Sequence, residues 1–173
     1  MSGAAVLALG NVLLGDDGAG PLAALELEAR WRLPPEVAVL DLGTPGLDLA
    51  PYLEGLDLAI VLDAIRADGA PGEVRVYRKR ELARRPPGIR TSPHDPGLRE
   101  ALGTLELAGR APSELVLVGV IPRATATGVG LSSEARAGAS RAADFVAGEL
   151  AAHGLRVERR IRPRTARAWW SGP

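Results

Sequence analysis

Short apolar runs of strand length, separated by segments with helical periodicity, are the feature that most constrains the fold of this chain. Most of these runs are nearly continuous, as expected for strands that helices cover on both faces of a sheet. A fifth segment, Glu73–Tyr77, alternates between polar and apolar residues and is predicted to be an edge strand with one face in water. The four apolar runs predicted to be strands are Ala4–Leu9, Val37–Leu40, Leu58–Leu62 and Leu115–Val120.

Helical patterns fill the intervals between these strands. Pro21 suits the first turn of a helix, because that position needs no backbone N–H donor. A second helix is predicted after His94, with Asp95 as its cap, and the longest is predicted to run from residue 132 or 133 to Gly154. Alternation of strands and helices predicts an α/β fold with an open, mostly parallel, doubly wound sheet.

The chain is predicted to hold one domain, residues 1–155, followed by an arginine-rich extension, residues 156–173. Apolar residues make up 46% of the sequence and its formal net charge is zero, which favours a packed core and argues against a nucleic-acid-binding protein. The extension is predicted to pack loosely on the surface. Binding of a partner or of nucleic acid by the extension is an alternative that the sequence leaves open.

Several classes of site and location are excluded or disfavoured. Without cysteine the chain has no disulfide, thiolate zinc site, iron–sulfur cluster or cysteine nucleophile. The apolar N-terminus lacks the basic segment of a signal peptide and is better interpreted as a first buried strand. No apolar run reaches the roughly 20 residues that span a bilayer. We therefore expect a cytoplasmic protein that does not insert into membranes.

Polar residues follow the predicted strands at their carboxyl ends, where open parallel sheets bind ligands. Asp63 is the clearest of them, since a carboxylate that closes a buried strand must be hydrogen-bonded, paired or coordinated. It is predicted to be a site residue, with capping of a following helix as the alternative. Asp16 and Asp17 follow the first strand, and adjacent side chains point in different directions. One is therefore predicted to face the site while the other caps the helix that Pro21 opens.

His94 is the third candidate. A lone histidine in a loop is usually only solvated, but this one precedes a predicted helix N-terminus, which favours the neutral imidazole that binds metals. Two carboxylates and one imidazole form a plausible ligand set for a divalent transition metal such as nickel or zinc. The segment DLGTPG after the second strand is either a plain turn or a binding loop, since Gly43 permits a tight turn there.

Other catalytic signatures are missing. The sequence contains no G-x-S-x-G, H-E-x-x-H or G-x-x-x-x-G-K-[ST] motif, and its first loop lacks G-x-G-x-x-G. A nucleotide- or phosphate-binding protein is therefore only a weak alternative.

Five motifs in a fixed order resemble those of the nickel–iron hydrogenase maturation endopeptidases over residues 4–155. They are GNVLLGDDGAG, DLGTPG, VLDAI, SPHDPGL and LVGVIP. The resemblance implies a three-layer α/β/α sandwich with a five-stranded, twisted sheet. It also implies removal of a C-terminal peptide from the hydrogenase large-subunit precursor after nickel insertion.

The same resemblance assigns the candidate residues. Asp17, Asp63 and His94 match the family's metal-contacting and catalytic positions, and many members carry glutamate where this chain has Asp17. Gly43 and Thr44 fall in a loop implied to touch the substrate. The nickel would arrive with the precursor, and other divalent metals are expected to replace it in vitro.

The resulting prediction is a nickel-gated endopeptidase that acts as a monomer on this precursor and binds no nucleic acid. The alternative is a non-catalytic nickel-binding or scaffold protein of hydrogenase assembly. Both predict metal contacts at the same three residues, and only the first predicts a shortened subunit.

Overall fold

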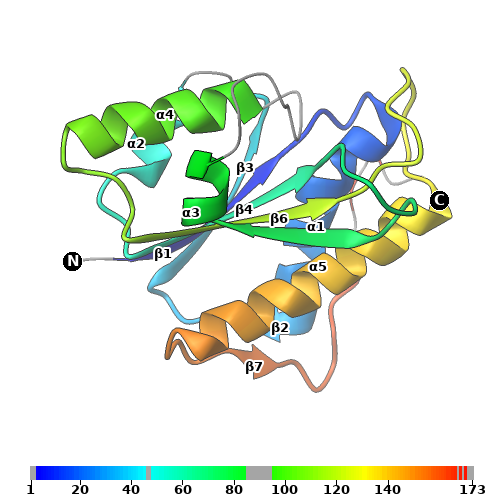
Figure 1. Ribbon diagram of the computed structural model, residues 1–173. Coiled ribbons are helices and arrows are strands. Elements are labelled where there is room, and N and C mark those ends of the chain that lie inside the picture. The colour runs from blue at the N-terminus through cyan, green and yellow to red at the C-terminus, as the bar shows by residue number, and fades with distance from the viewer. Residues whose placement is uncertain (1–2, 46–47, 85–94, 167, 169, 171–173) are drawn as a thin grey trace.

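A five-stranded sheet forms the centre of the molecule, between two layers of helices, as Figure 1 shows. This computed structural model describes residues 3–45, 48–84, 95–166, 168 and 170. The strand order is β3-β1-β4-β6-β5, with the first four strands parallel and β5 antiparallel to β6. The strands are β1 (Ala4–Leu9), β3 (Val37–Gly43), β4 (Leu58–Ala64), β5 (Val74–Arg78) and β6 (Glu114–Val120). The predicted α/β/α sandwich is confirmed.

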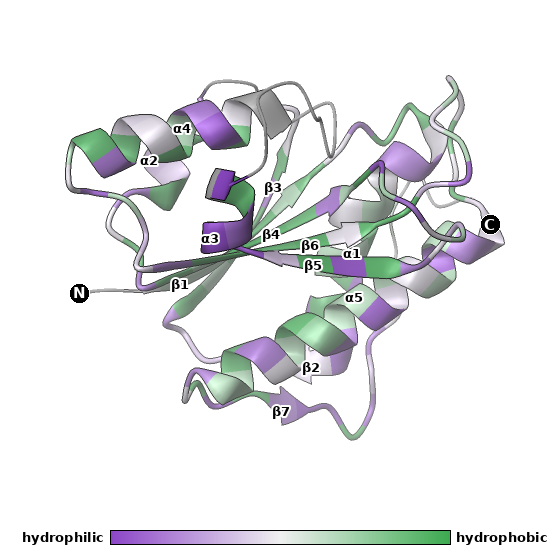
Figure 2. Cartoon of the chain, viewed as in Figure 1, coloured by the Kyte–Doolittle hydropathy of each residue, from purple (hydrophilic) through white to green (hydrophobic). Residues whose placement is uncertain are grey.

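The helices divide between the two faces of the sheet because successive strand residues point in opposite directions. Ile60 and Leu62 of β4 pack in one core with α1 and α5, and Val61 packs in the other with α2, α3 and α4. Figure 2 shows the largely apolar strands between helices that carry both hydrophilic and hydrophobic residues. None of the helices in the described ranges is long and apolar enough to span a bilayer. The helices are α1 (Ala19–Arg30), α2 (Ala50–Leu53), α3 (Lys79–Arg84), α4 (Asp95–Leu107) and α5 (Ser133–Ala152).

The predicted elements match the structure closely. The run Val37–Leu40 forms part of β3, which lies at the edge of the sheet and leaves Leu40 exposed. The short helix α3 begins directly after β5 and buries Leu82. The longest helix begins where predicted, and the hydroxyl of Ser132 caps it by accepting the N–H of Ala135.

The arginine-rich extension is fixed to the domain more closely than predicted. Its strand β7 (Glu158–Arg159) pairs antiparallel with β2 (Trp31–Arg32), the short strand that follows α1. The backbone N–H of Arg164 donates to the carbonyl of Ala29 at 2.9 Å, and Trp170 is buried in the core of α1 and α5. The predicted loose packing is therefore wrong, because a strand pairing and a buried tryptophan hold the extension in place.

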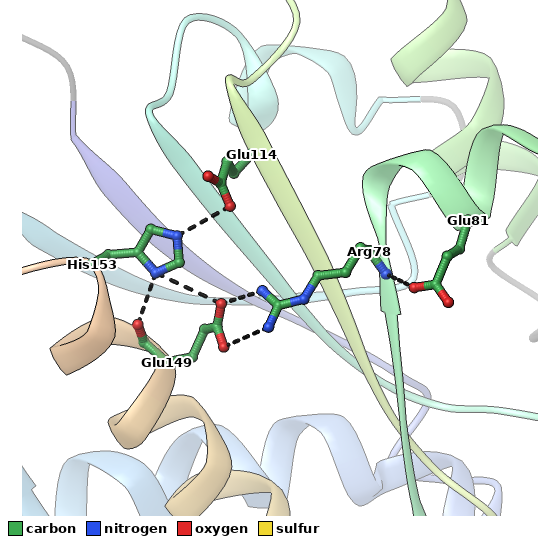
Figure 3. Close-up of polar contacts among 5 residues, drawn as sticks. All are labelled: Arg78, Glu81, Glu114, Glu149 and His153. Carbon is green, nitrogen blue, oxygen red and sulfur yellow. Dashed lines mark hydrogen bonds and ion pairs between the residues drawn. The ribbon is translucent and has the colours of Figure 1, made fainter.

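A cluster of charged residues links α5 to β5 and β6 at the end where the parallel strands begin (Figure 3). Glu149 is buried and forms an ion pair with Arg78. His153 lies beside it, 2.8 Å from the backbone carbonyl of Glu149 and 3.1 Å from a carboxylate oxygen of Glu114. That carbonyl first, and then the Glu114 carboxylate, raises the pKa of His153 above its ordinary value of 6.5.

We expect this cluster to make stability depend on pH. The fold favours protonated His153, so its contribution is complete below pH 6.5 and is lost as the pH rises through the raised pKa. Urea unfolding midpoints should therefore fall over this window in the wild type and change less in His153→Gln. An equal pH dependence in both proteins would contradict the assignment.

Candidate functional site

The loop between β1 and α1 turns back on itself and buries the side chain of Asp17. This residue lies in the short 3-10 helix η1 (Gly15–Gly18), and its side chain is 2% exposed. Gly10 has a φ of +146°, and a Cβ there would overlap the carbonyl oxygen of Asp17, so glycine permits the close approach. One carboxylate oxygen of Asp17, Oδ2, accepts the N–H of Asn11 at 2.7 Å. The other, Oδ1, is buried with no hydrogen-bond partner in the part of the chain that the structure describes.

Asp63 occupies the carboxyl end of the central strand β4 and is also 2% exposed. Its Oδ1 accepts the N–H of Ala64 at 2.8 Å. The alternative that Asp63 caps a following helix is wrong, because residues 65–73 form no helix and lead directly into β5. A buried carboxylate at a strand end without a helix to cap is typical of a binding site.

The start of α1 brings these two carboxylates to the same edge of the sheet. A Cβ at Gly20 would clash with the carbonyl oxygen of Leu9 and lie 2.6 Å from that of Leu62. The helix therefore begins against the carboxyl ends of β1 and β4, and η1 contacts β4 directly. Asp17 lies just before this contact and Asp63 just after it, so both lie where open parallel sheets bind their ligands.

His94, the third predicted ligand, lies outside the described residues. The helix α4 begins at the next position, Asp95, and covers the face of the sheet that carries Val61. No group of three metal-binding side chains occurs among the described residues, and because His94 is not among them, this leaves the predicted trio untested.

Asp16, the neighbour of Asp17, has a different role. Its Oδ2 accepts the N–H of Arg123 at 2.8 Å and the hydroxyl of Ser132 at 2.7 Å, and its Oδ1 accepts the N–H of Ser132 at 2.6 Å. The prediction that one of the two aspartates caps α1 is wrong, since α1 has no side-chain cap. The hydrogen bonds of Asp16 instead join η1 to the loop after β6 and to the start of α5. As predicted, the two carboxylates point in different directions.

Gly43 and Thr44, the predicted substrate-contacting residues, lie beside the same loop. The carbonyl of Gly43 accepts the N–H of Gly10 at 2.9 Å, and its own N–H donates to the carboxylate of Asp41 at 3.0 Å. The φ of Gly43 is +58°, so this position needs glycine. Thr44 follows it directly after the end of β3 and is exposed.

The structure adds one part of this edge that the sequence did not predict. The segments 13–16 and 123–132 are joined by backbone hydrogen bonds, among them Gly128 N–H to Leu13 at 2.9 Å. Leu13 and Val129 are both exposed along this joined rim. A hollow of about 250 Å³ lies between the two segments. Residues 124–130, ATATGVG, are small and show no periodic pattern, so the sequence did not predict that they form a rim.

Comparisons with known proteins find relatives of similar sequence and similar fold. The sequence matches the hydrogenase maturation protease family (HycI) over residues 21–149. It is 36% identical over 159 residues to the hydrogenase expression/formation protein HupD of Bradyrhizobium diazoefficiens, which covers 91% of this chain and 83% of that protein. It is 38% identical over 131 residues to the hydrogenase 2 maturation protease of Escherichia coli, over 73% of this chain and 77% of that protein. The solved structure of the hydrogenase maturating endopeptidase HybD from E. coli matches with a TM-score of 0.82 at 33% identity, over 91% and 98% of the two chains.

Proposed function

We propose, since this chain belongs to the hydrogenase maturation protease family, that it is the endopeptidase that removes the C-terminal peptide of a nickel–iron hydrogenase large-subunit precursor. Family membership makes the chain a protease, a hydrolase of peptide bonds. The removal follows nickel insertion in this proposal, so the precursor carries the metal to the enzyme. We further propose that the protein acts in the cytoplasm as a monomer.

The observation that carries this proposal is the pair of buried carboxylates, Asp17 and Asp63, at one edge of the sheet. A buried acceptor that lacks a donor costs free energy, and Oδ1 of Asp17 is such an atom in the described structure. A divalent cation brought by the substrate would satisfy this oxygen. Carboxylate oxygens together with an imidazole suit nickel, and we assign the imidazole to His94.

The residues of this chain would then distinguish nickel-loaded precursor from nickel-free precursor. Asp17, Asp63 and His94 complete the coordination of a nickel ion that the precursor already holds, so nickel-free precursor lacks the feature that they bind. Other divalent ions of similar preference are expected to replace nickel in vitro. We also assign contact with the substrate backbone to Gly43 and Thr44. The exposure of Thr44 and the hydrogen bond between the Gly10 N–H and the Gly43 carbonyl support this assignment.

The bound nickel would act as a Lewis acid or activate a water molecule, the two ways in which a metal promotes peptide hydrolysis. The protein side supplies negative charge from two buried carboxylates and excludes bulk water around them. In the scaffold alternative the same residues contact the metal, but no peptide bond is cleaved. Membership of a protease family favours the endopeptidase over this alternative.

Incubation of the purified chain with nickel-loaded precursor tests this function. We expect the mass of the large subunit to fall by the mass of one C-terminal peptide. A stable complex in which the precursor keeps its full mass would support the scaffold alternative and contradict the proposal.

A further inference from the structure

Charge is divided unequally between the domain and the extension. Residues 156–173 carry six arginines and one glutamate, a formal charge of +5, whereas residues 1–155 carry −5, in a chain whose net charge is zero. Within the described structure, no arginine of the extension forms an ion pair with a residue of the domain. Arg156 pairs with Glu158 of the extension itself. Arg160 donates to the backbone carbonyls of Glu28 and Trp31. Among the described residues of the extension, the positive charge is therefore not neutralised by carboxylates of the domain.

Strand pairing and backbone hydrogen bonds hold the backbone at these arginines in a fixed position on the domain. Arg159 lies in β7, opposite Trp31 of β2, and its guanidinium is 5.8 Å from the centre of the Trp31 ring. The N–H groups of Arg160 and Arg164 donate to the carbonyls at the end of α1, at 2.8 and 2.9 Å. A partner that binds here does not have to order the chain first, which lowers the entropic cost of association.

A hollow of about 450 Å³ lies among these residues, lined by Arg32, Glu158, Arg159, Arg160, Ile161 and Arg162. Arg32, Arg159 and Arg162 are exposed and have no ion-pair partner in the described part of the chain. Ile161 is 99% exposed between them. We call these four residues, Arg32, Arg159, Ile161 and Arg162, the basic hollow.

We propose that the basic hollow is a docking surface for an acidic, partly apolar patch on the hydrogenase large-subunit precursor. Its charge selects an acidic partner, and a fully exposed isoleucine between arginines suits a protein surface, because arginine and apolar side chains together are typical of protein interfaces. Nucleic acid is less favoured, since the domain behind the hollow carries a net charge of −5 and would repel a long polyanion.

The position of the hollow favours the precursor as the occupant, and this step rests on the proposed function. The helix α1 begins two residues after Asp17 and ends at Arg30, directly before β2. Its 12 residues span about 18 Å. A standard protein interface buries about 800 Å² on each partner and is roughly 30 Å across. A protein that places its C-terminal segment against Asp17 is thus large enough to reach the hollow as well.

Two double variants with the same change in net charge test this proposal. Arg159→Glu/Arg162→Glu reverses two charges of the hollow. The control, Arg80→Glu/Arg110→Glu, reverses two exposed arginines by α3 and α4, on the other face of the sheet. For each protein we would measure the Kd for nickel-loaded precursor, and the KM and kcat of its cleavage, at about 50 mM and about 500 mM salt.

At low salt we expect the hollow variant to raise Kd and KM about tenfold and to change kcat less than about twofold, because charge at the rim of an interface acts on association. The increase in Kd and KM should be smaller at high salt. At low salt, Arg159→Gln/Arg162→Gln should increase Kd and KM less than the glutamate variant does. If the wild type cleaves the precursor but the hollow variant binds it with the same Kd as the control, the basic hollow is not a docking surface, and the proposed function is unaffected. Absence of cleavage by the wild type would instead overturn the proposed function. Tighter binding of a 20-base-pair DNA duplex (about two helical turns) than of the precursor would make the hollow a nucleic-acid site.

Discussion

Asp63→Asn should reduce cleavage of the nickel-loaded precursor by at least about a hundredfold, the scale on which lost metal contacts act. Asparagine has nearly the same shape, and its carbonyl oxygen can still accept the N–H of Ala64. The substitution therefore removes the negative charge at the end of β4 and leaves the local hydrogen bond in place. The rate is measured as the fall in mass of the large subunit with time.

Asp57→Asn is the matched control for this variant. Asp57 directly precedes β4 at its opposite end and is exposed, so the same chemical change occurs far from the carboxyl edge of the sheet. The control should cleave the precursor at the wild-type rate. Full activity of Asp63→Asn, with a folded protein, would show that the carboxylate of Asp63 takes no part in the reaction.

Gly20→Ala is expected to have the largest effect on stability, a loss of about 3 kcal/mol or more in the free energy of unfolding. A Cβ at this position would clash with the carbonyl oxygen of Leu9 and lie 2.6 Å from that of Leu62, and both are backbone atoms of buried strands. The start of α1 would have to move away from β1 and β4 to make room. Because η1 directly precedes α1, Asp17 would move with it and cleavage should also fall.

Gly148→Ala provides the comparison for Gly20→Ala. Gly148 lies in α5, where an added Cβ would meet no atom within 4 Å, so alanine should stabilise the helix by about 0.5–1 kcal/mol. Urea unfolding of both variants measures the difference. Equal stability of the two variants would mean that α1 does not pack against the strand ends as closely as the structure indicates.

The sequence predicted the central strands β1, β4 and β6 well because they are buried on both faces and therefore appear as continuous apolar runs. Ala4–Leu9 and Leu58–Leu62 are examples, and both are buried throughout their length. The pairing of β2 with β7 was not predictable in the same way. It joins residues 31–32 to residues 158–159, and two-residue strands are too short to show any periodicity.

The site was predictable only in part. The carboxyl-edge rule predicted that Asp63 and the neighbouring aspartates lie at the edge of the sheet where the structure has them, but the choice of Asp17 over Asp16 as a ligand came from family resemblance. The structure is consistent with that choice, because the oxygens of Asp16 accept hydrogen bonds from Arg123 and Ser132. His153 lies at the end of α5, where the sequence indicates no partner for it. Its contact with Glu114 joins segments 39 residues apart, a contact that local sequence does not reveal.

The proposed function depends on recognition of nickel that is already bound to the substrate. The most direct test compares cleavage of one precursor preparation before and after nickel loading, with the wild-type enzyme and the same buffer. We predict that the loaded precursor is shortened and that the nickel-free precursor keeps its mass. Equal rates for the two forms would contradict the claim.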